Sequence, residues 1–120
     1  MAKKAYTILI IEDEPDISEL IEYSLTQSGY SIIVSDNGEK GIEVTRKHSP
    51  DLILLDLMLP GINGIDVCRI LKNDNDTSEV SIIMLTALGQ EEDIIKGLET
   101  GADDYVTKPF SFPVLEARIQ

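Results

Sequence analysis

The chain has 120 residues, of which 42% are hydrophobic and 27% are charged, and its formal net charge is −12. These values are typical of a single globular domain over residues 1–120; they exclude a disordered chain, and the acidic excess argues against nucleic-acid binding by this domain. No apolar stretch is as long as a bilayer is thick and the N-terminal MAKKAYTILII lacks a signal-peptide cleavage region, so we expect a cytoplasmic domain that binds no membrane.

Five short apolar runs alternate with segments of helical periodicity. The runs are Ile8–Ile11, Ile32–Val34, Leu52–Leu55, Ile82–Leu85 and the weaker Tyr105–Val106. Their continuity, without polar alternation, predicts strands covered on both faces, as in a parallel sheet. Helices are expected between Pro15 and Gly29, over Gly38–Lys47, Gly64–Asn73 and Glu91–Thr100, and from Ser111 onward. Five strand–helix units in succession, (βα)5, favour an α/β fold with a doubly wound five-stranded parallel sheet.

Three local features refine this pattern. Ile17, Leu20, Ile21 and Leu25 form the clearest apolar stripe, in the first helix. The single cysteine, Cys68, lies on the apolar side of the third helix, so we expect a buried structural thiol. The chain stops at Gln120 without a helix C-cap signal, so we expect the last helix to be truncated there and the domain to belong to a longer protein.

Polar residues follow the ends of four predicted strands. Glu12 and Asp13 follow the first run, Asp56 the third, Thr86 the fourth and Lys108 the fifth. Each alone has a structural explanation, as a turn, cap or surface residue. In a doubly wound sheet, however, sites form outside the carboxyl ends of the strands, where the strand order reverses. With the order 2-1-3-4-5, three carboxylates converge between the first and third strands.

The charge of this cluster indicates its chemistry. Three carboxylates repel one another, and one lysine cannot balance them. A hard divalent cation can, and oxygen-only ligands suit Mg²⁺ better than zinc. An anionic aspartate beside Mg²⁺, a lysine and a threonine hydroxyl is an arrangement for phosphoryl transfer onto the aspartate.

Four segments carry a resemblance to a known family: ILIIEDEPDI, PDLILLDLMLPGINGID, IIMLTAL and GLETGADDYVTKPF. Together they resemble the receiver domains of two-component response regulators, which have the flavodoxin-like fold of CheY. The resemblance covers essentially the whole chain. It is closest to the receivers of winged-helix transcription factors of the OmpR/PhoB type, which share the GADDY-TKPF stretch.

The resemblance implies a role for each residue of the cluster. Asp56 is the expected phosphoacceptor, with the phosphohistidine of a sensor histidine kinase as donor. Glu12 and Asp13 match the acidic pair that holds Mg²⁺, for which Mn²⁺ can substitute, and Glu12 is expected to act through water. The backbone carbonyl of Met58 supplies a further ligand. We expect a phosphoacceptor that assists its own phosphorylation and dephosphorylation rather than an enzyme.

The family's switch and dimer residues are matched in the same way. Thr86 and Lys108 are expected to contact the phosphoryl group, and Tyr105 is the switch aromatic that packs inward when the threonine moves. Phosphorylation is expected to promote a homodimer through the fourth helix, fifth strand and fifth helix. The matching residues are Asp103, Asp104 and Arg118, with an Asp104–Arg118 contact across the two-fold axis, while Ile94 and Val114 stand where relatives carry a basic and an acidic residue.

Other functions remain open at this point. A haloacid-dehalogenase-type phosphatase also uses an aspartate after a strand, but it needs a second acid where this chain has Met58. A flavodoxin-like FMN carrier needs a hydroxyl- and glycine-rich loop after the first strand, where Glu12-Asp13-Glu14-Pro15 stands. Within the receiver family, the chain either controls transcription through an output domain beyond Gln120 or acts as a stand-alone receiver by protein–protein contact.

Overall fold

The computed structural model describes residues 6–87, 95, 99, 101–108 and 117–119. Its strands are β1 Thr7–Ile11, β2 Ser31–Ser35, β3 Leu52–Asp56, β4 Ser81–Ala87 and β5 Asp104–Lys108, and its helices are α1 Pro15–Gln27, α2 Gly38–His48 and α3 Gly64–Asn73. Every expected strand is present, and each is one to three residues longer than its apolar run. The fourth and fifth expected helices fall mostly outside the described residues.

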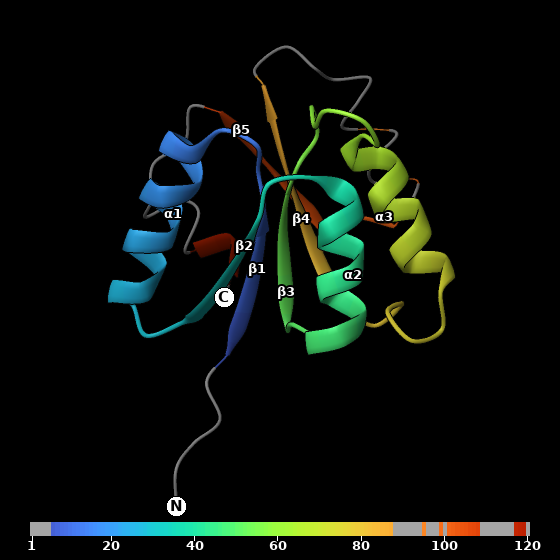
Figure 1. Cartoon of the computed structure of the whole chain (residues 1–120), viewed down its shortest axis with the longest axis horizontal. Coiled ribbons are helices and arrows are strands. Elements are labelled where there is room, and N and C mark those ends of the chain that lie inside the picture. The colour runs from blue at the N-terminus through green and yellow to red at the C-terminus, as the bar shows by residue number, and fades with distance from the viewer. Residues whose placement is uncertain (1–5, 88–94, 96–98, 100, 109–116, 120) are drawn as a thin grey trace, which may run out of the picture.

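The five strands form one sheet in the order β2-β1-β3-β4-β5, and every neighbouring pair is parallel (Figure 1). This confirms the fold class and the strand order expected from the sequence. The order reverses between β1 and β3. The chain places β2 on one side of β1 and then crosses to the other side, where β3, β4 and β5 follow in sequence. Parallel strands end at a common edge, so the carboxyl ends of β1 and β3 lie beside each other there.

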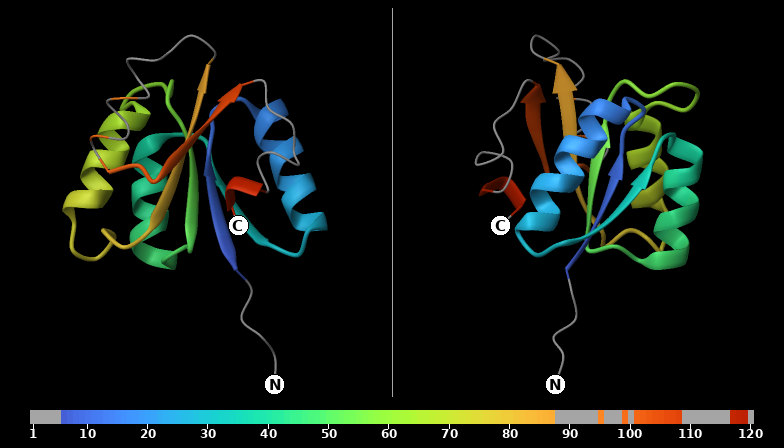
Figure 2. Two further views of the ribbon diagram at one scale, coloured as in Figure 1. Left: turned by 180° about the vertical axis from the view of Figure 1, so that it is seen from behind. Right: turned by 60° about the vertical axis from the view of Figure 1, so that its left-hand side comes forward.

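Helices cover both faces of the sheet, and each face has its own core (Figures 1 and 2). Leu9 and Ile11 of β1 face α2 and α3, where they join a cluster that contains Val67 and Leu71. The alternate residues of β1, and those of β3, pack on the other side against α1, and Ile119 lies against the same cluster. Successive strand residues point to opposite faces, so a strand buried on both sides must be apolar throughout.

The helix faces agree with the sequence with one correction. Cys68 is fully buried in the α2–α3 face, as expected. In α1, Ile21 and Leu25 are buried, whereas Leu20 is 60% exposed. The side of α1 that faces the sheet carries Ile17, Ile21 and Leu25, which are spaced four residues apart. Leu20 precedes Ile21 by one residue and therefore points about 100° away around the helix, toward solvent. Among the residues that the structure describes, no helix combines the length and apolar character that a membrane span requires.

Candidate functional site

The register of β1 and β3 brings two of the predicted carboxylates level with each other. Ile11 pairs with Leu55 in the parallel ladder, so the next residues along the two strands are Glu12 and Asp56. Asp13 follows in the turn before α1. One carboxylate oxygen from each of the three acids lies within 4.8 Å of those of the other two. The predicted convergence at the switch point is therefore present in the structure.

Two of these acids are removed from solvent. Glu12 is 1% exposed and Asp56 is 4% exposed. Their backbones are held by the sheet: the Glu12 N–H donates to the Ser35 carbonyl at 3.0 Å, and the Leu57 N–H donates to the Leu85 carbonyl at 3.0 Å. Burying anionic carboxylates side by side is costly unless positive charge compensates them. A set of three oxygen donors at this spacing fits a hard divalent cation such as Mg²⁺, which usually keeps several waters.

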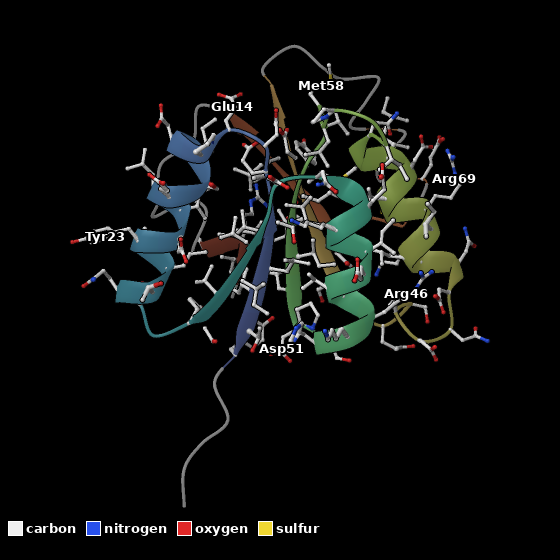
Figure 3. All side chains as sticks on the ribbon, viewed as in Figure 1. Glu14, Tyr23, Arg46, Asp51, Met58 and Arg69 are labelled. Atoms are coloured by element: carbon white, nitrogen blue, oxygen red, sulfur yellow. The ribbon has the colours of Figure 1, made fainter. Side chains whose placement is uncertain are left out.

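Met58 contributes its backbone to the same site. Its N–H donates to Oδ1 of Asp56 at 3.2 Å, so one carboxylate oxygen is held by the turn that follows β3. The Met58 side chain is 67% exposed and lies at the rim of this edge (Figure 3). The hydrogen bond gives the buried Asp56 carboxylate a preferred orientation.

The remaining predicted site residues lie on β4 and β5. Thr86 pairs with Thr107, and Lys108, the last residue of β5, pairs with Ala87. Both backbones therefore reach the carboxyl edge of the sheet, as predicted, while their side chains lie outside the described residues. Tyr105 pairs with Met84 and is 37% exposed, so in this structure the predicted switch aromatic is not buried.

A model of the response regulator receiver domain family matches residues 8–120. The chain belongs to this family. The receiver is 50% identical to the phosphate regulon transcriptional regulatory protein PhoB of Pseudomonas aeruginosa over 114 residues, which cover 95% of this chain and 50% of PhoB. The chain thus spans about half the length of the curated relatives that it matches.

Solved structures agree with this assignment. A putative response regulator from Chloroflexus aurantiacus superposes on the receiver with a TM-score of 0.93 at 35% identity, over 97% of this chain and 95% of that one. The BeF3-activated N-terminal receiver domain of Klebsiella pneumoniae RstA gives a TM-score of 0.87 at 36% identity, with 94% of each chain covered. The resemblance stated from the sequence is confirmed, and it decides against the phosphatase and the flavin carrier.

The acids predicted for the dimer face of the receiver lie at the amino-terminal ends of the strands, where β5 begins, and so at the end of the sheet away from the three carboxylates. The Asp103 carboxylate accepts the backbone N–H of Ile82 at 2.7 Å, and the Asp103 N–H donates to the Ile82 carbonyl at 2.8 Å. Lys72 Nζ lies 3.5 Å from the same carboxylate oxygen. Asp103 therefore joins β4, β5 and α3 within one chain, a role that the sequence analysis missed.

Asp104 also has a partner within the chain. Its Oδ2 lies 3.4 Å from Nη1 of Arg118, and the two side chains are 30% and 55% exposed. The pair that the sequence predicted across a two-fold axis thus exists here as an intramolecular contact. Ile94 and Val114 lie outside the described residues.

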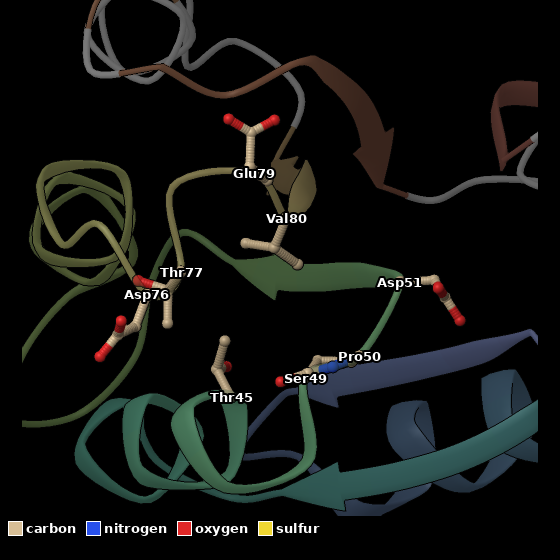
Figure 4. A pocket seen from close by; sticks show the side chains of 8 residues that line it. All are labelled: Thr45, Ser49, Pro50, Asp51, Asp76, Thr77, Glu79 and Val80. Atoms are coloured by element: carbon tan, nitrogen blue, oxygen red, sulfur yellow. The ribbon is translucent and has the colours of Figure 1, made fainter.

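The same strand-start arrangement occurs at β3. The carboxylate of Asp51 accepts the N–H of Thr7 at 2.8 Å, and the Asp51 N–H donates to the Thr7 carbonyl at 2.8 Å. A cavity of about 220 Å³ lies beside it, and Figure 4 shows Asp51 turned away from the cavity. The Thr45 and Thr77 hydroxyls that line this cavity already donate to helix carbonyls. We assign these groups to the stability of the receiver.

Proposed function

We propose that this receiver takes a phosphoryl group from the phosphohistidine of a sensor histidine kinase onto Asp56, with Mg²⁺ held by Glu12, Asp13 and Asp56. The observation that carries the proposal is the convergence of these three carboxylates within 4.8 Å at the switch point of the sheet. Two of them are almost fully buried, and a divalent cation stabilises buried carboxylates that lie this close together. Membership of the receiver family supports the same assignment.

The chain's own residues perform the transfer by positioning. The N–H of Met58 donates to Oδ1 of Asp56 and orients the carboxylate, one oxygen of which attacks phosphorus in line. The new P–O bond forms as the P–N bond to the donor imidazole breaks, and the released histidine takes up a proton. Bound Mg²⁺, to which the Met58 carbonyl is a further proposed ligand, supplies positive charge near the phosphoryl oxygens.

Two more strand ends complete the proposed site. Lys108 neutralises one phosphoryl oxygen, and Thr86 donates its hydroxyl to another. The position of both residues at the carboxyl ends of β5 and β4 supports these roles. By resemblance to the family, Tyr105, which is 37% exposed in this structure, packs inward when Thr86 moves toward the phosphate. The receiver is a phosphoacceptor that assists its own phosphorylation and hydrolysis, and it turns over no separate substrate.

The whole protein has a further role in this proposal. PhoB of Pseudomonas aeruginosa is a transcriptional regulatory protein about twice the length of the matched region. We propose that this receiver acts in the cytoplasm and controls transcription through an output domain, so nucleic-acid contacts do not involve the acidic receiver itself. The alternative is a stand-alone receiver that signals by protein–protein contact.

Mg²⁺-dependent phosphorylation is the direct test of this function. Incubation with acetyl phosphate and Mg²⁺ should add the mass of one phosphoryl group to the intact chain, because the metal offsets repulsion between the carboxylates and the donor. Excess chelator should abolish the adduct, and Mn²⁺ should restore it. Intact-protein mass spectrometry distinguishes these states. A full adduct in the presence of chelator would contradict the proposal.

Dimerisation on activation is a second expectation. Beryllofluoride, which mimics the phosphoryl group, should shift the receiver from monomer to dimer in sedimentation velocity. The intramolecular Asp104–Arg118 pair must then exchange for its intermolecular equivalent, so Arg118→Ala should weaken the dimer at least several-fold. The same change should alter monomer stability by less than about 1 kcal/mol, because exposed ion pairs contribute little. A dimer of unchanged strength in Arg118→Ala would remove this pair from the interface.

A further inference from the structure

The backbone that carries Asp56 is held from two sides. On one side, the Leu57 N–H donates to the Leu85 carbonyl of β4 at 3.0 Å. On the other side, the N–H of Gly64, the first residue of α3, donates to the Leu57 carbonyl at 3.0 Å. The first residue of α3 is therefore hydrogen-bonded directly to Leu57, the residue that follows the proposed phosphoacceptor Asp56.

Position 64 has no room for a side chain. A Cβ atom there would lie 2.4 Å from the Asp56 carbonyl oxygen and 2.9 Å from the Leu57 Cα. Real Cβ atoms essentially never come closer than 3.0 Å to a non-bonded atom, so the nearest atom would have to move by at least about 0.6 Å, the difference between 3.0 and 2.4 Å. Both contacting atoms belong to the backbone, so no change of side-chain rotamer can relieve the clash.

Neither α3 nor the Asp56–Leu57 backbone can move freely to relieve this clash. The α3 helix is anchored by Val67, Cys68 and Leu71, all fully buried between the helix and the sheet. Leu57 is itself 3% exposed, and its N–H belongs to the ladder with β4. A side chain at position 64 must therefore displace the Asp56–Leu57 backbone, the helix, or both, in a closely packed interior.

We propose that Gly64 is a positioning residue for the carboxylate site: its missing side chain lets α3 fix the place and tilt of the Asp56 peptide, and thereby the direction of the Asp56 carboxylate. This inference rests on the function proposed above. It differs from an ordinary glycine requirement because Gly64 begins a helix, where alanine is a better helix former than glycine.

The chain contains a matched control for this position. α2 begins with the same Asn–Gly pair: Asn37 caps the helix and Gly38 follows, as Asn63 and Gly64 do in α3. A Cβ at Gly38 would also be crowded, at 2.6 Å from Cγ2 of Ile62 and from Cγ2 of Val67. These two nearest atoms are the ends of side chains, the Ile62 carbonyl oxygen follows at 3.1 Å, and none of the three atoms belongs to Asp56 or Leu57. Gly38→Ala therefore presses on α3 and on the loop before it, mainly through the side chains of Ile62 and Val67, but makes no contact with the Asp56–Leu57 backbone.

The test compares Gly64→Ala with Gly38→Ala in the complete chain. The free energy of unfolding in urea without metal measures the structural cost of each change.

Mn²⁺ binding by electron paramagnetic resonance, with Mg²⁺ as competitor, reports the carboxylate geometry independently of phosphorylation. Gly64→Ala should bind Mn²⁺ roughly 10- to 100-fold more weakly, as is typical when the residues that orient metal ligands are altered. Its phosphorylation by acetyl phosphate should slow by roughly 10- to 100-fold, because a misplacement of 1 Å can cost 100-fold. Gly38→Ala, which presses on α3 but not on the Asp56–Leu57 backbone, should lose far less Mn²⁺ affinity than Gly64→Ala does.

A second pair of variants covers the case in which Gly64→Ala does not fold. Asn63→Ala removes the cap that accepts the Asp66 N–H at 2.9 Å, and Asn37→Ala removes the equivalent cap to Lys40 at 2.8 Å. The two losses should cost similar stability, about 1 kcal/mol each. Only Asn63→Ala should weaken Mn²⁺ binding, by several-fold, because it loosens the helix turn that rests on Leu57.

The outcomes separate this inference from the function on which it rests. Equal Mn²⁺ affinity in the α3 variants and their α2 controls, with the wild type binding normally, overturns the role of Gly64 and leaves the proposed function intact. A wild-type chain that binds neither Mn²⁺ nor Mg²⁺ overturns both.

Discussion

Asp56→Asn is expected to abolish the phosphoryl adduct and, in the absence of divalent metal, to make the receiver more stable than the wild type. Asn retains an oxygen that can accept the Met58 N–H, so the local hydrogen bond survives. It removes one of three carboxylates that lie within 4.8 Å of one another. At an effective dielectric constant of 20, each of the two pairwise repulsions that Asp56 takes part in amounts to roughly 3.5 kcal/mol at that separation. Residual solvation offsets most of this repulsion, so we expect a gain of about 1–2 kcal/mol.

The stability order should reverse when Mg²⁺ is added. A ligand that binds only the folded state stabilises it in proportion to RT ln(1 + [L]/Kd), and the variant loses most of that increment with its third carboxylate. Urea unfolding with and without Mg²⁺, alongside intact mass after acetyl phosphate, measures all three effects. Asp66→Asn is the control, because this carboxylate lies in an exposed pair with Arg69 and should change stability by less than about 1 kcal/mol. A metal-free Asp56→Asn that is less stable than the wild type would show that the carboxylates do not repel in the folded state.

The meeting of Glu12 and Asp56 was predictable because it follows from periodicity and topology together. Apolar runs locate the strands, and alternating strands and helices imply a parallel sheet. In a parallel sheet the residues just after neighbouring strands must meet at one edge. No contact between particular side chains had to be known for that step.

Gly64 could not be recognised in the same way. The Asn–Gly pair at 63–64 indicates a helix start, and the same letters occur at 37–38. What distinguishes the two positions is the nearest neighbour of the missing Cβ, which is the backbone of Asp56 and Leu57 at Gly64 and the side chains of Ile62 and Val67 at Gly38. That difference depends on how closely α3 approaches the end of β3, a distance that no local pattern encodes. The sequence placed Leu20 in the apolar stripe of α1, although its side chain is exposed. Apolar character alone does not say which side of α1 packs against the sheet.

Asp103 shows how one residue can fit two interpretations. The family resemblance places it on a dimer face, where its carboxylate would be available to a second molecule. In the structure that carboxylate accepts the Ile82 N–H and lies near Lys72 Nζ, while Lys72 also donates to the Val80 carbonyl. Asp51 makes the equivalent bond to Thr7 at β3. An aspartate directly before a strand thus extends the ladder by one hydrogen bond, in β3 and in β5 alike.

Asp103→Ala is accordingly expected to destabilise the receiver by about 2 kcal/mol. Ile82 is fully buried, so the change leaves its N–H without an acceptor, and an unsatisfied buried donor costs about 1–3 kcal/mol. Asp103→Asn keeps an acceptor at the same place and should lose less than about 1 kcal/mol, since the carboxylate is 51% exposed and its pairing with Lys72 at 3.5 Å is weak. Urea unfolding measures both variants, and faster amide exchange at Ile82 in Asp103→Ala alone would locate the cause. If Asp103→Ala instead unfolds like the wild type but fails to dimerise with beryllofluoride, Asp103 belongs to the dimer face and its bond to Ile82 contributes nothing to stability.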